Sequence, residues 1–389
     1  MLKVLMMGGR RCGKTSALAS LFNQMIHGAT NDYLTVSDDT ILETKPDPVT
    51  NQPEPQDSLT NKRLELERFI DKGGNSTFLV DAGPTRNFWD YKLRVQIPGT
   101  NKSTTLQFRD SAGEFFDAGG KHHPEVVDFI RDCDVFVVVV DTPYLMAGSK
   151  SENAAANILD SIHTFLTQID NDKGRKEKQV IFVPIKCEKW IQEGTIDEVV
   201  QKVEEVYATT IKHLEATGKT EVCIIPIQTA GDILFSELRD AYVLYNSLTK
   251  KKVKCAKESD RLVILKDGKH HKVGPSEVVE EDMEATFVYL DKEGKEHSSI
   301  QRPAAWYHLP IDRKAEYNPH NCEQLPLHII RFMFNKMEKN AHGGIWGKLA
   351  SFIFGSITKE DLQKALSGLS QRGLIKDNVE GIKTLKRCF

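Results

Sequence analysis

The N-terminal stretch LKVLMMGGRRCGKTSALASLFNQMI, residues 2–26, decides the fold of this chain. Leu2–Met7 is a short apolar run, which is typical of a strand covered on both faces within a parallel sheet. From Thr15 to Ile26 apolar residues recur at helical spacing, and Gly28 ends the pattern. The stretch therefore predicts a buried strand, a glycine loop and a helix in direct succession.

The loop, Gly8-x-x-x-x-Gly13-Lys14-Thr15, matches the Walker A pattern of phosphate-binding P-loops. Its glycines let backbone N–H groups curl around phosphates, and the positive end of the next helix adds to the attraction. Lys14 would neutralise the β and γ charges, and the Thr15 hydroxyl would bind magnesium. We expect nucleotide contacts from Gly8, Gly9, Arg10, Arg11, Cys12, Gly13, Lys14, Thr15 and Ser16. The alternative is a glycine turn that only joins a strand to a helix.

Further apolar runs at 135–140, 180–185 and 221–227 also have the character of buried strands. Helical stretches at about 151–170 and 195–217 separate them, so strands and helices alternate along the chain. This order predicts an α/β fold in which helices flank a mostly parallel sheet.

The rest of the chain divides around this unit. We predict an α/β domain over 1–235, with a helical insertion at about 40–80 in which 44–57 is an exposed loop. An insertion with β-hairpins follows over 236–320, a helix that completes the first domain over 321–340, and a helical extension over 341–389.

Composition excludes several classes of protein. The 389 residues carry a net charge of −3, without the basic excess of a chain that binds nucleic acid in bulk. The 7 cysteines form no C-x-x-C pair, so a reduced, cytoplasmic protein is the simplest interpretation. His122-His123 and His270-His271 lack metal-ligand spacing and are more typical of surface residues. The apolar stretch 343–354 could lie on a membrane surface, but its length favours a packed element.

A second motif lies about a hundred residues after the glycine loop, in LQFRDSAGEFF at 106–116. A hairpin, with arms 91–97 and 104–108, leads into it. This motif resembles the second switch segment of Ras-like GTPases, in which the acid, here Asp110, holds magnesium through water and the N–H of the glycine, here Gly113, senses a γ-phosphate. DAGPTRNFWDY, just before the hairpin, resembles their first switch segment, in which a threonine, here Thr85, closes over the metal. An ordinary loop threonine is the alternative.

Together these motifs resemble the Ras-like, translation-factor class of P-loop GTPases. The resemblance identifies Asp110-Ser111-Ala112-Gly113-Glu114 with the second switch segment and Thr85 with the first. It implies a G-domain that binds GTP or GDP with Mg²⁺ held by Thr15, Thr85 and Asp110.

The guanine-reading motif departs from that family. Where the family has N/T-K-x-D, this chain has Ile185-Lys186-Cys187-Glu188, so the Asn is replaced and the acid is one methylene longer. Lys186 keeps the stem that packs on a base, and Glu188 can still accept from guanine. Thr229 and Ala230 are the candidates for backbone N–H groups that meet the base. A solvated charge pair at a strand end is the alternative for Lys186 and Glu188.

Residues that would govern hydrolysis also depart from the family. Glu114 stands where a water-orienting glutamine is usual, and its charge would be repelled by the γ-phosphate, so hydrolysis should be slow. Arg10 and Arg11 replace loop glycines. They could act as a built-in arginine finger, block one from a partner, or point to solvent, and Arg86 is a second candidate finger. Lys14, Glu114, Arg10 and Arg86 are thus the candidate catalytic residues.

More narrowly, the strings GGRRCGKTS, FRDSAGEFF, IKCEK and CEQLPL resemble the bacterial double-GTPase type family. That resemblance implies a partner within a multi-protein conflict or phage-defence system, and nothing points to nucleic acid or a membrane. We expect a nucleotide switch that slowly hydrolyses GTP to GDP. A weakly active pseudo-GTPase that serves as an interaction module is the alternative, and an ATPase or kinase is disfavoured by the switch motifs.

Overall fold

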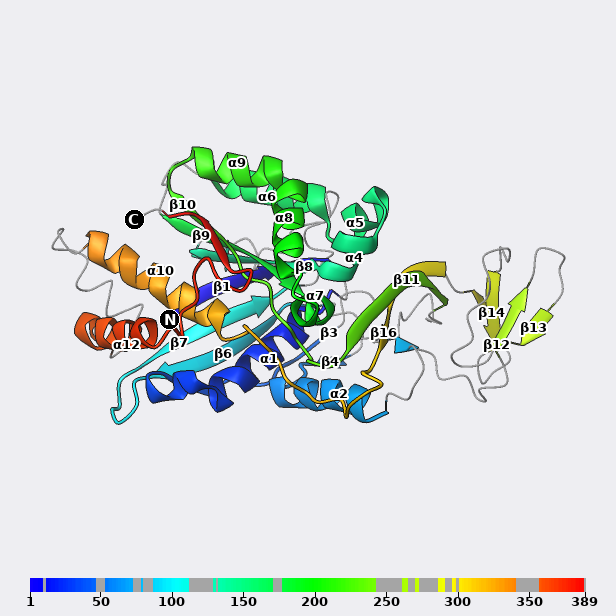
Figure 1. Ribbon diagram of the computed structural model, residues 1–389, viewed down its shortest axis with the longest axis horizontal. Coiled ribbons are helices and arrows are strands. Elements are labelled where there is room, and N and C mark those ends of the chain that lie inside the picture. The colour runs from blue at the N-terminus through cyan, green and yellow to red at the C-terminus, as the bar shows by residue number, and fades with distance from the viewer. Residues whose placement is uncertain are drawn as a thin grey trace.

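A computed structural model gives the fold (Figure 1). It describes residues 1–9, 12–46, 53–72, 78–79, 87–111, 129–130, 132–170, 177–242, 261–264, 270–272, 286–290, 296–298, 301–340 and 357–387. Among these residues the central sheet has eight strands in the order β17-β10-β9-β8-β1-β7-β6-β2. Its strands are β1 (Leu2–Met7), β2 (Thr35–Asp38), β6 (Trp89–Gln96), β7 (Ser103–Asp110), β8 (Val135–Asp141), β9 (Lys178–Ile185), β10 (Thr220–Ile224) and β17 (Lys383–Lys386).

The core of the sheet is parallel. The strands β10, β9, β8, β1 and β7 all run in one direction. At the two sides β6 pairs antiparallel with β7, β2 pairs antiparallel with β6, and β17 pairs antiparallel with β10. Every residue of β8 is buried, because both faces of the sheet are covered. The predicted α/β class, with a mostly parallel sheet flanked by helices, is confirmed.

Helices form a layer on each face. One layer, around Leu18, Ile330 and Leu366, comes from α1 (Lys14–His27), α10 (Gln324–Asn340) and α12 (Lys359–Gln371). The other comes from α4 (Thr142–Ala147), α6 (Leu159–Asp170), α8 (Ile196–Val206) and α9 (Ala208–Ala216). Figure 1 shows α6, α8 and α9 above the sheet and α1 below it. Alternate residues of each strand supply the two cores, with Val137 facing one and Phe136 the other.

The predicted helices at 151–170 and 195–217 are each two helices. The first is α5 (Lys150–Ala156) and α6, separated at Ile158, whose φ of 44° is left-handed and cannot continue a helix. The second is α8 and α9, which meet at Tyr207. The predicted helix of the insertion at 40–80 is α2 (Leu59–Lys72), while α7 (Glu188–Gln192) and the 3-10 turn Ala29–Asp32 are short additions.

The region 44–57 is more ordered than predicted. Its described residues form β3 (Thr44–Pro46) and β4 (Pro53–Pro55), which pair antiparallel. The amine of Lys45 donates to the carbonyl of Phe88 and lies over the rings of Phe88 and Trp89. Cation–π contacts therefore hold this ribbon against the protein, which its polar composition did not predict.

An arm leaves the sheet after residue 233. It consists of β11 (Leu234–Tyr242) and β16 (Gln301–His308), paired antiparallel, with β5 (Phe78–Leu79) on the far side of β16. The predicted hairpins are confirmed as pairs, β12 (Arg261–Ile264) with β13 (His270–Lys272) and β14 (Thr286–Leu290) with β15 (Glu296–Ser298). Pairing of β12 with β14 joins them into one sheet at the far end of the arm (Figure 1).

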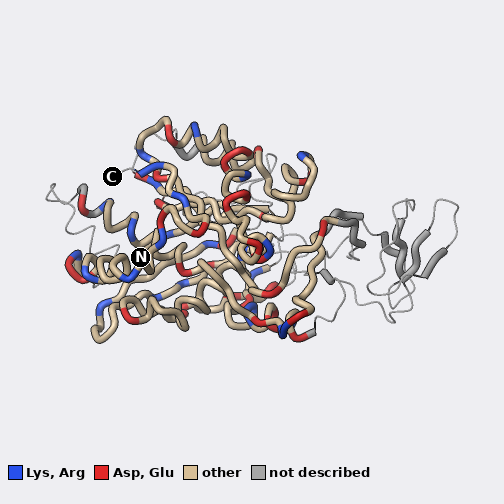
Figure 2. The backbone as a smooth tube through the Cα atoms, in the orientation of Figure 1, with Lys and Arg blue, Asp and Glu red and all other residues tan. Residues whose placement is uncertain are grey.

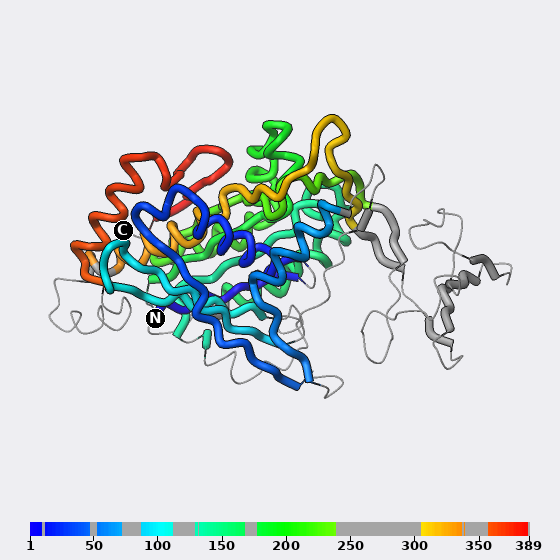
Figure 3. The backbone as a smooth tube through the Cα atoms, turned by 90° about the horizontal axis from the view of Figure 1, so that it is seen from below, coloured from blue at the N-terminus to red at the C-terminus, as the bar shows by residue number. Residues whose placement is uncertain are grey.

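The C-terminal segment returns to the central sheet. α12 confirms one predicted helix, but 383–386 forms a strand, β17, in a region predicted to be helical. Lys102 of the β6–β7 turn pairs with Asp361 at 2.6 Å, and Arg372 pairs with Asp32 at 3.0 Å. Figure 3 shows this red segment beside the cyan turn and the blue N-terminal region.

Figure 2 shows that charged residues of both signs are spread over the described elements. The whole chain carries a net charge of −3. No described helix is long and apolar enough to span a bilayer.

His328 of α10 gives the fold a pH dependence. Its ring is buried, Nε2 lies 2.8 Å from the carbonyl oxygen of Lys376, and Arg331 lies 3.1 Å from Nδ1. Burial, together with the charge of Arg331, lowers the pKa of His328 to about 4. The ring is therefore neutral in the folded protein at pH 7, with Nε2–H donating to Lys376.

We predict that the free energy of unfolding falls between pH 6.5 and pH 4, because the unfolded histidine binds a proton there and the folded one does not. At pH 5 this contribution is about 2 kcal/mol. His328→Gln should lose less stability between pH 7 and pH 5 than the wild type, as measured by urea denaturation. The exposed His320→Gln is the control, and an unchanged pH dependence of His328→Gln would contradict the prediction.

Candidate functional site

The carboxyl ends of the parallel strands gather the candidate residues at one edge of the sheet. Here β1 runs into the glycine loop, residues 8–13, and β7 ends at Asp110. β8 ends at Asp141, β9 at Ile185, and the segment after β10 contains Thr229 and Ala230. In open α/β sheets this edge is where ligands bind.

The described glycines of the loop are fixed by close packing. A Cβ on Gly9 would lie 1.8 Å from the carbonyl oxygen of Ala156, and one on Gly8 would lie 2.7 Å from that of Val139. Gly13 has a φ of 108°, in the left-handed region, and its position faces Ile185. The backbone therefore needs glycine at these points for its own conformation, whatever it binds.

Lys14 lies against the loop that precedes it. Its Nζ donates to the carbonyl oxygens of Gly8 at 3.2 Å and Gly9 at 3.0 Å, and the residue is only 5% exposed. Gly13 is the N-cap of α1, and no side chain caps the helix. The positive end of a fourteen-residue helix and an ammonium group thus lie together, which favours an anion.

Asp110 is fully buried next to Thr15. The Thr15 hydroxyl donates to Asp110 Oδ2 at 2.5 Å, since β1 and β7 are neighbouring strands. Burial raises the pKa of Asp110, although Lys14 and Thr15 oppose the shift. Asp110 Oδ1 is buried and has no hydrogen-bond partner in the part of the chain that the structure describes. A hydroxyl and an unsatisfied carboxylate oxygen are hard oxygen ligands, so this pair fits Mg²⁺.

Lys186 and Asp141 form an ion pair. Lys186 was predicted to belong to the site, but Asp141 was not. Lys186 Nζ lies 2.5 Å from Asp141 Oδ2, and the Lys186 backbone has a φ of 60°. Burial disfavours the charge of Lys186, but Asp141 more than offsets this and holds the pKa of Lys186 above its ordinary value. The only available signal was that Asp141 ends an entirely apolar strand at the ligand edge.

Glu188 is held by the segment after β10, whose residues Thr229 and Ala230 were predicted to contact a base beside it. Its Oε1 accepts from the N–H and hydroxyl of Thr229, at 2.8 and 3.0 Å, and from the N–H of Ala230 at 2.7 Å. The two backbone N–H groups predicted to face a base are therefore used by Glu188. Its other oxygen, Oε2, is buried and has no partner among the residues that the structure describes, and burial raises the pKa of the carboxyl.

A cavity of about 40 Å³ lies where these elements meet. Its wall contains residues of the glycine loop, of α1 and of the two segments after β9 and β10, together with residues from α2 and β16. The lining residues are Gly13, Ser16, Leu66, Ile185, Lys186, Glu188, Thr229, Ala230, Ile233 and Tyr307. The lining is mostly apolar, with the charged side chains of Lys186 and Glu188.

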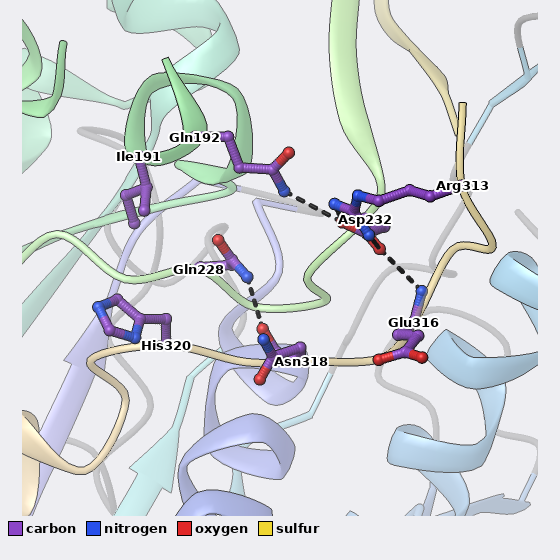
Figure 4. A pocket seen from close by; sticks show the side chains of 8 residues that line it. All are labelled: Ile191, Gln192, Gln228, Asp232, Arg313, Glu316, Asn318 and His320. Carbon is purple, nitrogen blue, oxygen red and sulfur yellow. Dashed lines mark hydrogen bonds and ion pairs between the residues drawn. The ribbon is translucent and has the colours of Figure 1, made fainter. Parts of the chain in front are cut away.

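A larger pocket of about 360 Å³ lies on the other side of the segment 228–232 (Figure 4). One wall is a clasp, the ion pair between Arg313 and Asp232, in which Arg313 Nη2 donates to Asp232 Oδ1 at 2.5 Å. Asp232 also accepts from the N–H of Glu316 at 2.8 Å and from Gln192 at 3.1 Å. The clasp therefore fixes the start of β11 to the chain that follows β16.

The structure brings together most of the predicted site. Gly8, Gly9, Cys12, Gly13, Lys14, Thr15, Ser16, Asp110, Lys186, Glu188, Thr229 and Ala230 all lie at the carboxyl edge of the sheet. Arg10, Arg11, Thr85, Arg86, Gly113 and Glu114 lie outside the described residues. Cys12 is buried, and burial raises the pKa of its thiol. The described residues contain no group of three or more His, Cys, Asp or Glu that could hold a metal.

Comparison with models of known protein families gives no match for this chain, and comparison with curated proteins gives none either.

We predict that the Lys186–Asp141 pair couples the strand ends energetically. Lys186→Met should lower the free energy of unfolding by about 2 kcal/mol, because it leaves Asp141 buried and unpaired. The double variant Asp141→Leu/Lys186→Met should recover at least half of that loss. Denaturant unfolding measures both, and Lys202→Met, from an exposed pair with Glu205, is the control. A double variant no more stable than Lys186→Met would contradict the coupling.

Proposed function

We propose that this protein is a guanine-nucleotide switch that hydrolyses GTP slowly and thereby controls a protein partner. The observation that carries the proposal is the contact between Thr15 and Asp110 below an uncapped helix N-terminus, where one Asp110 oxygen has no partner among the described residues. The glycine loop would then be a P-loop, and the α/β sheet a G-domain.

The triphosphate would bind where the helix end and Lys14 coincide. Lys14 now donates to two loop carbonyls, Gly8 and Gly9, which are weaker acceptors than phosphate oxygens. An incoming phosphate can take over this ammonium group, while the first N–H groups of α1 donate to it. Lys14 and the N-terminus of α1 would therefore bind the phosphate without a side chain moving in from elsewhere in the chain.

Mg²⁺ would be held by Thr15 and Asp110, with Thr85 as the third ligand that the resemblance implies. Bound there, it would neutralise part of the charge on the β- and γ-phosphates. Asp110 contributes a carboxylate that burial makes costly to keep charged without a cation.

Glu188 is the residue that would select guanine. Its Oε1 is saturated by Thr229 and Ala230, so Oε2 alone is open to accept from a base N–H. Guanine offers donors at N1 and at its 2-amino group, whereas the corresponding edge of adenine lacks them. Lys186, held by Asp141, would pack its stem on the base.

Hydrolysis and switching rest on Glu114, Arg10, Arg86, Thr85 and Gly113. Their assignment comes from the resemblance to Ras-like GTPases. Because Glu114 carries a charge where a neutral glutamine is usual, we expect slow turnover that a partner accelerates. A nucleotide-stabilised interaction module without turnover is the alternative outcome.

We predict that Lys14→Ala weakens binding of a fluorescent GTP analogue roughly a hundredfold, because a charge-assisted contact is lost. Asp110→Asn should remove the gain in affinity that Mg²⁺ gives, while leaving metal-free binding within about threefold. Lys212→Ala and Asp197→Asn, both at exposed positions on other helices, are the controls. Fluorescence titration with and without magnesium measures the constants, and unchanged binding by Lys14→Ala would overturn the proposal.

We also predict that Glu188→Gln changes the preferred base. The amide oxygen can keep the bonds from Thr229 and Ala230, so the fold is retained, and the NH₂ group then replaces Oε2. An acceptor becomes a donor, which suits the 2-oxo group of xanthine and repels guanine. GTP affinity should fall at least about thirtyfold and xanthosine triphosphate should bind better than GTP. Competition titrations test this, and a wild type that prefers ATP would exclude the guanine assignment.

A further inference from the structure

No local sequence pattern predicts Tyr307 at the wall of the cavity beside Lys186 and Glu188, which we call the base cavity. Tyr307 belongs to β16, within the insertion predicted over 236–320. The residue is 4% exposed. The insertion therefore contributes part of the wall of the site itself.

The ring of Tyr307 is fixed by an aromatic series. It meets Phe235 of β11 edge to face, with centroids 6.3 Å apart, and Phe235 stacks on Trp190 of α7 at 5.6 Å. Trp190 follows Glu188 by two residues. Such pairs restrain ring orientation, so Tyr307 presents a defined edge to the cavity.

The hydroxyl of Tyr307 has no hydrogen-bond partner among the described residues. It lies in a strongly polar field, since Lys186, Asp141 and Glu188 all influence its pKa, which burial raises above the ordinary value. Tyrosine hydroxyls in buried surroundings usually have a partner. An open hydroxyl at the wall of a cavity is therefore suited to a ligand.

We propose that Tyr307 is a base-contacting residue supplied by the β11–β16 arm, and that the arm senses whether the base cavity is occupied. The inference rests on the proposed nucleotide function and extends it by naming the element that responds. A base in the cavity would take the Tyr307 hydroxyl as a partner and pack against its ring.

Two connections carry the response outward. Tyr307 pairs with Phe78 of β5, and Phe78 precedes by only a few residues Thr85, the predicted γ-phosphate sensor. On the other side, Tyr307 pairs with Phe235 of β11. The Arg313–Asp232 clasp holds the ends of both strands to the segment that contains Thr229 and Ala230 (Figure 4). A shift in the base cavity therefore reaches both strands of the arm.

Affinity for fluorescent GDP tests the contact. Tyr307→Leu should bind at least tenfold more weakly than the wild type, and Tyr307→Phe two- to fivefold more weakly. The matched controls are Tyr207→Leu and Tyr207→Phe, because Tyr207 is also buried, has a hydroxyl without a partner and does not line the cavity. They should stay within twofold of the wild type. Equal affinities for Tyr307→Leu and the wild type would overturn the contact.

Hydrogen exchange tests the sensing in the unaltered protein. Saturating GDP or a GTP analogue should slow amide exchange in β11 and β16 at least threefold, and Tyr307→Phe should reduce this protection. Bound nucleotide without any protection of β11 and β16 would overturn the inference and leave the proposed function intact. A wild type that binds no guanine nucleotide in the titration would overturn both.

Discussion

Buried carboxylates at one edge of the sheet are the constraint on which the site depends. Asp110 and Asp141 end strands β7 and β8, and Glu188 follows β9. Each keeps a buried oxygen that has no partner among the described residues. Burying a charge is costly unless something compensates it. Here Thr15, Lys186 and the N–H groups of Thr229 and Ala230 supply part of that compensation. The oxygens left without a partner are the part of these carboxylates that the described residues do not compensate.

The architecture explains why these groups meet. The parallel strands β1, β8, β9 and β10 deliver their carboxyl ends to the same edge, so loops far apart in sequence become neighbours. The arm adds residues from a further part of the chain. Because β16 lies between β11 and β5, one strand contacts the base cavity and the segment that precedes Thr85.

Much of this could be predicted from local patterns. The apolar run at 2–7 and the glycine loop with Lys14 and Thr15 are local patterns of neighbouring residues, and Asp110 was found from the short motif that begins where its strand ends. Strand β17 was missed because its sequence KTLK is polar and its conformation depends on pairing with β10. Tyr307 and the Arg313–Asp232 clasp were missed for the same reason. Their partners lie far along the chain, and no local pattern encodes such contacts.

The clasp has a consequence for how this protein could diversify. Arg313 and Asp232 bring the two ends of residues 233–312 together at the surface of the α/β unit. Once the ends of an excursion are fixed, its length adds little entropic cost, because that cost grows only with the logarithm of loop length. The sheet formed by β12, β13, β14 and β15 can therefore be exchanged, shortened or enlarged over evolutionary time while the Arg313–Asp232 clasp stays constant. One unit of this kind could acquire new specificities by replacing what the arm presents.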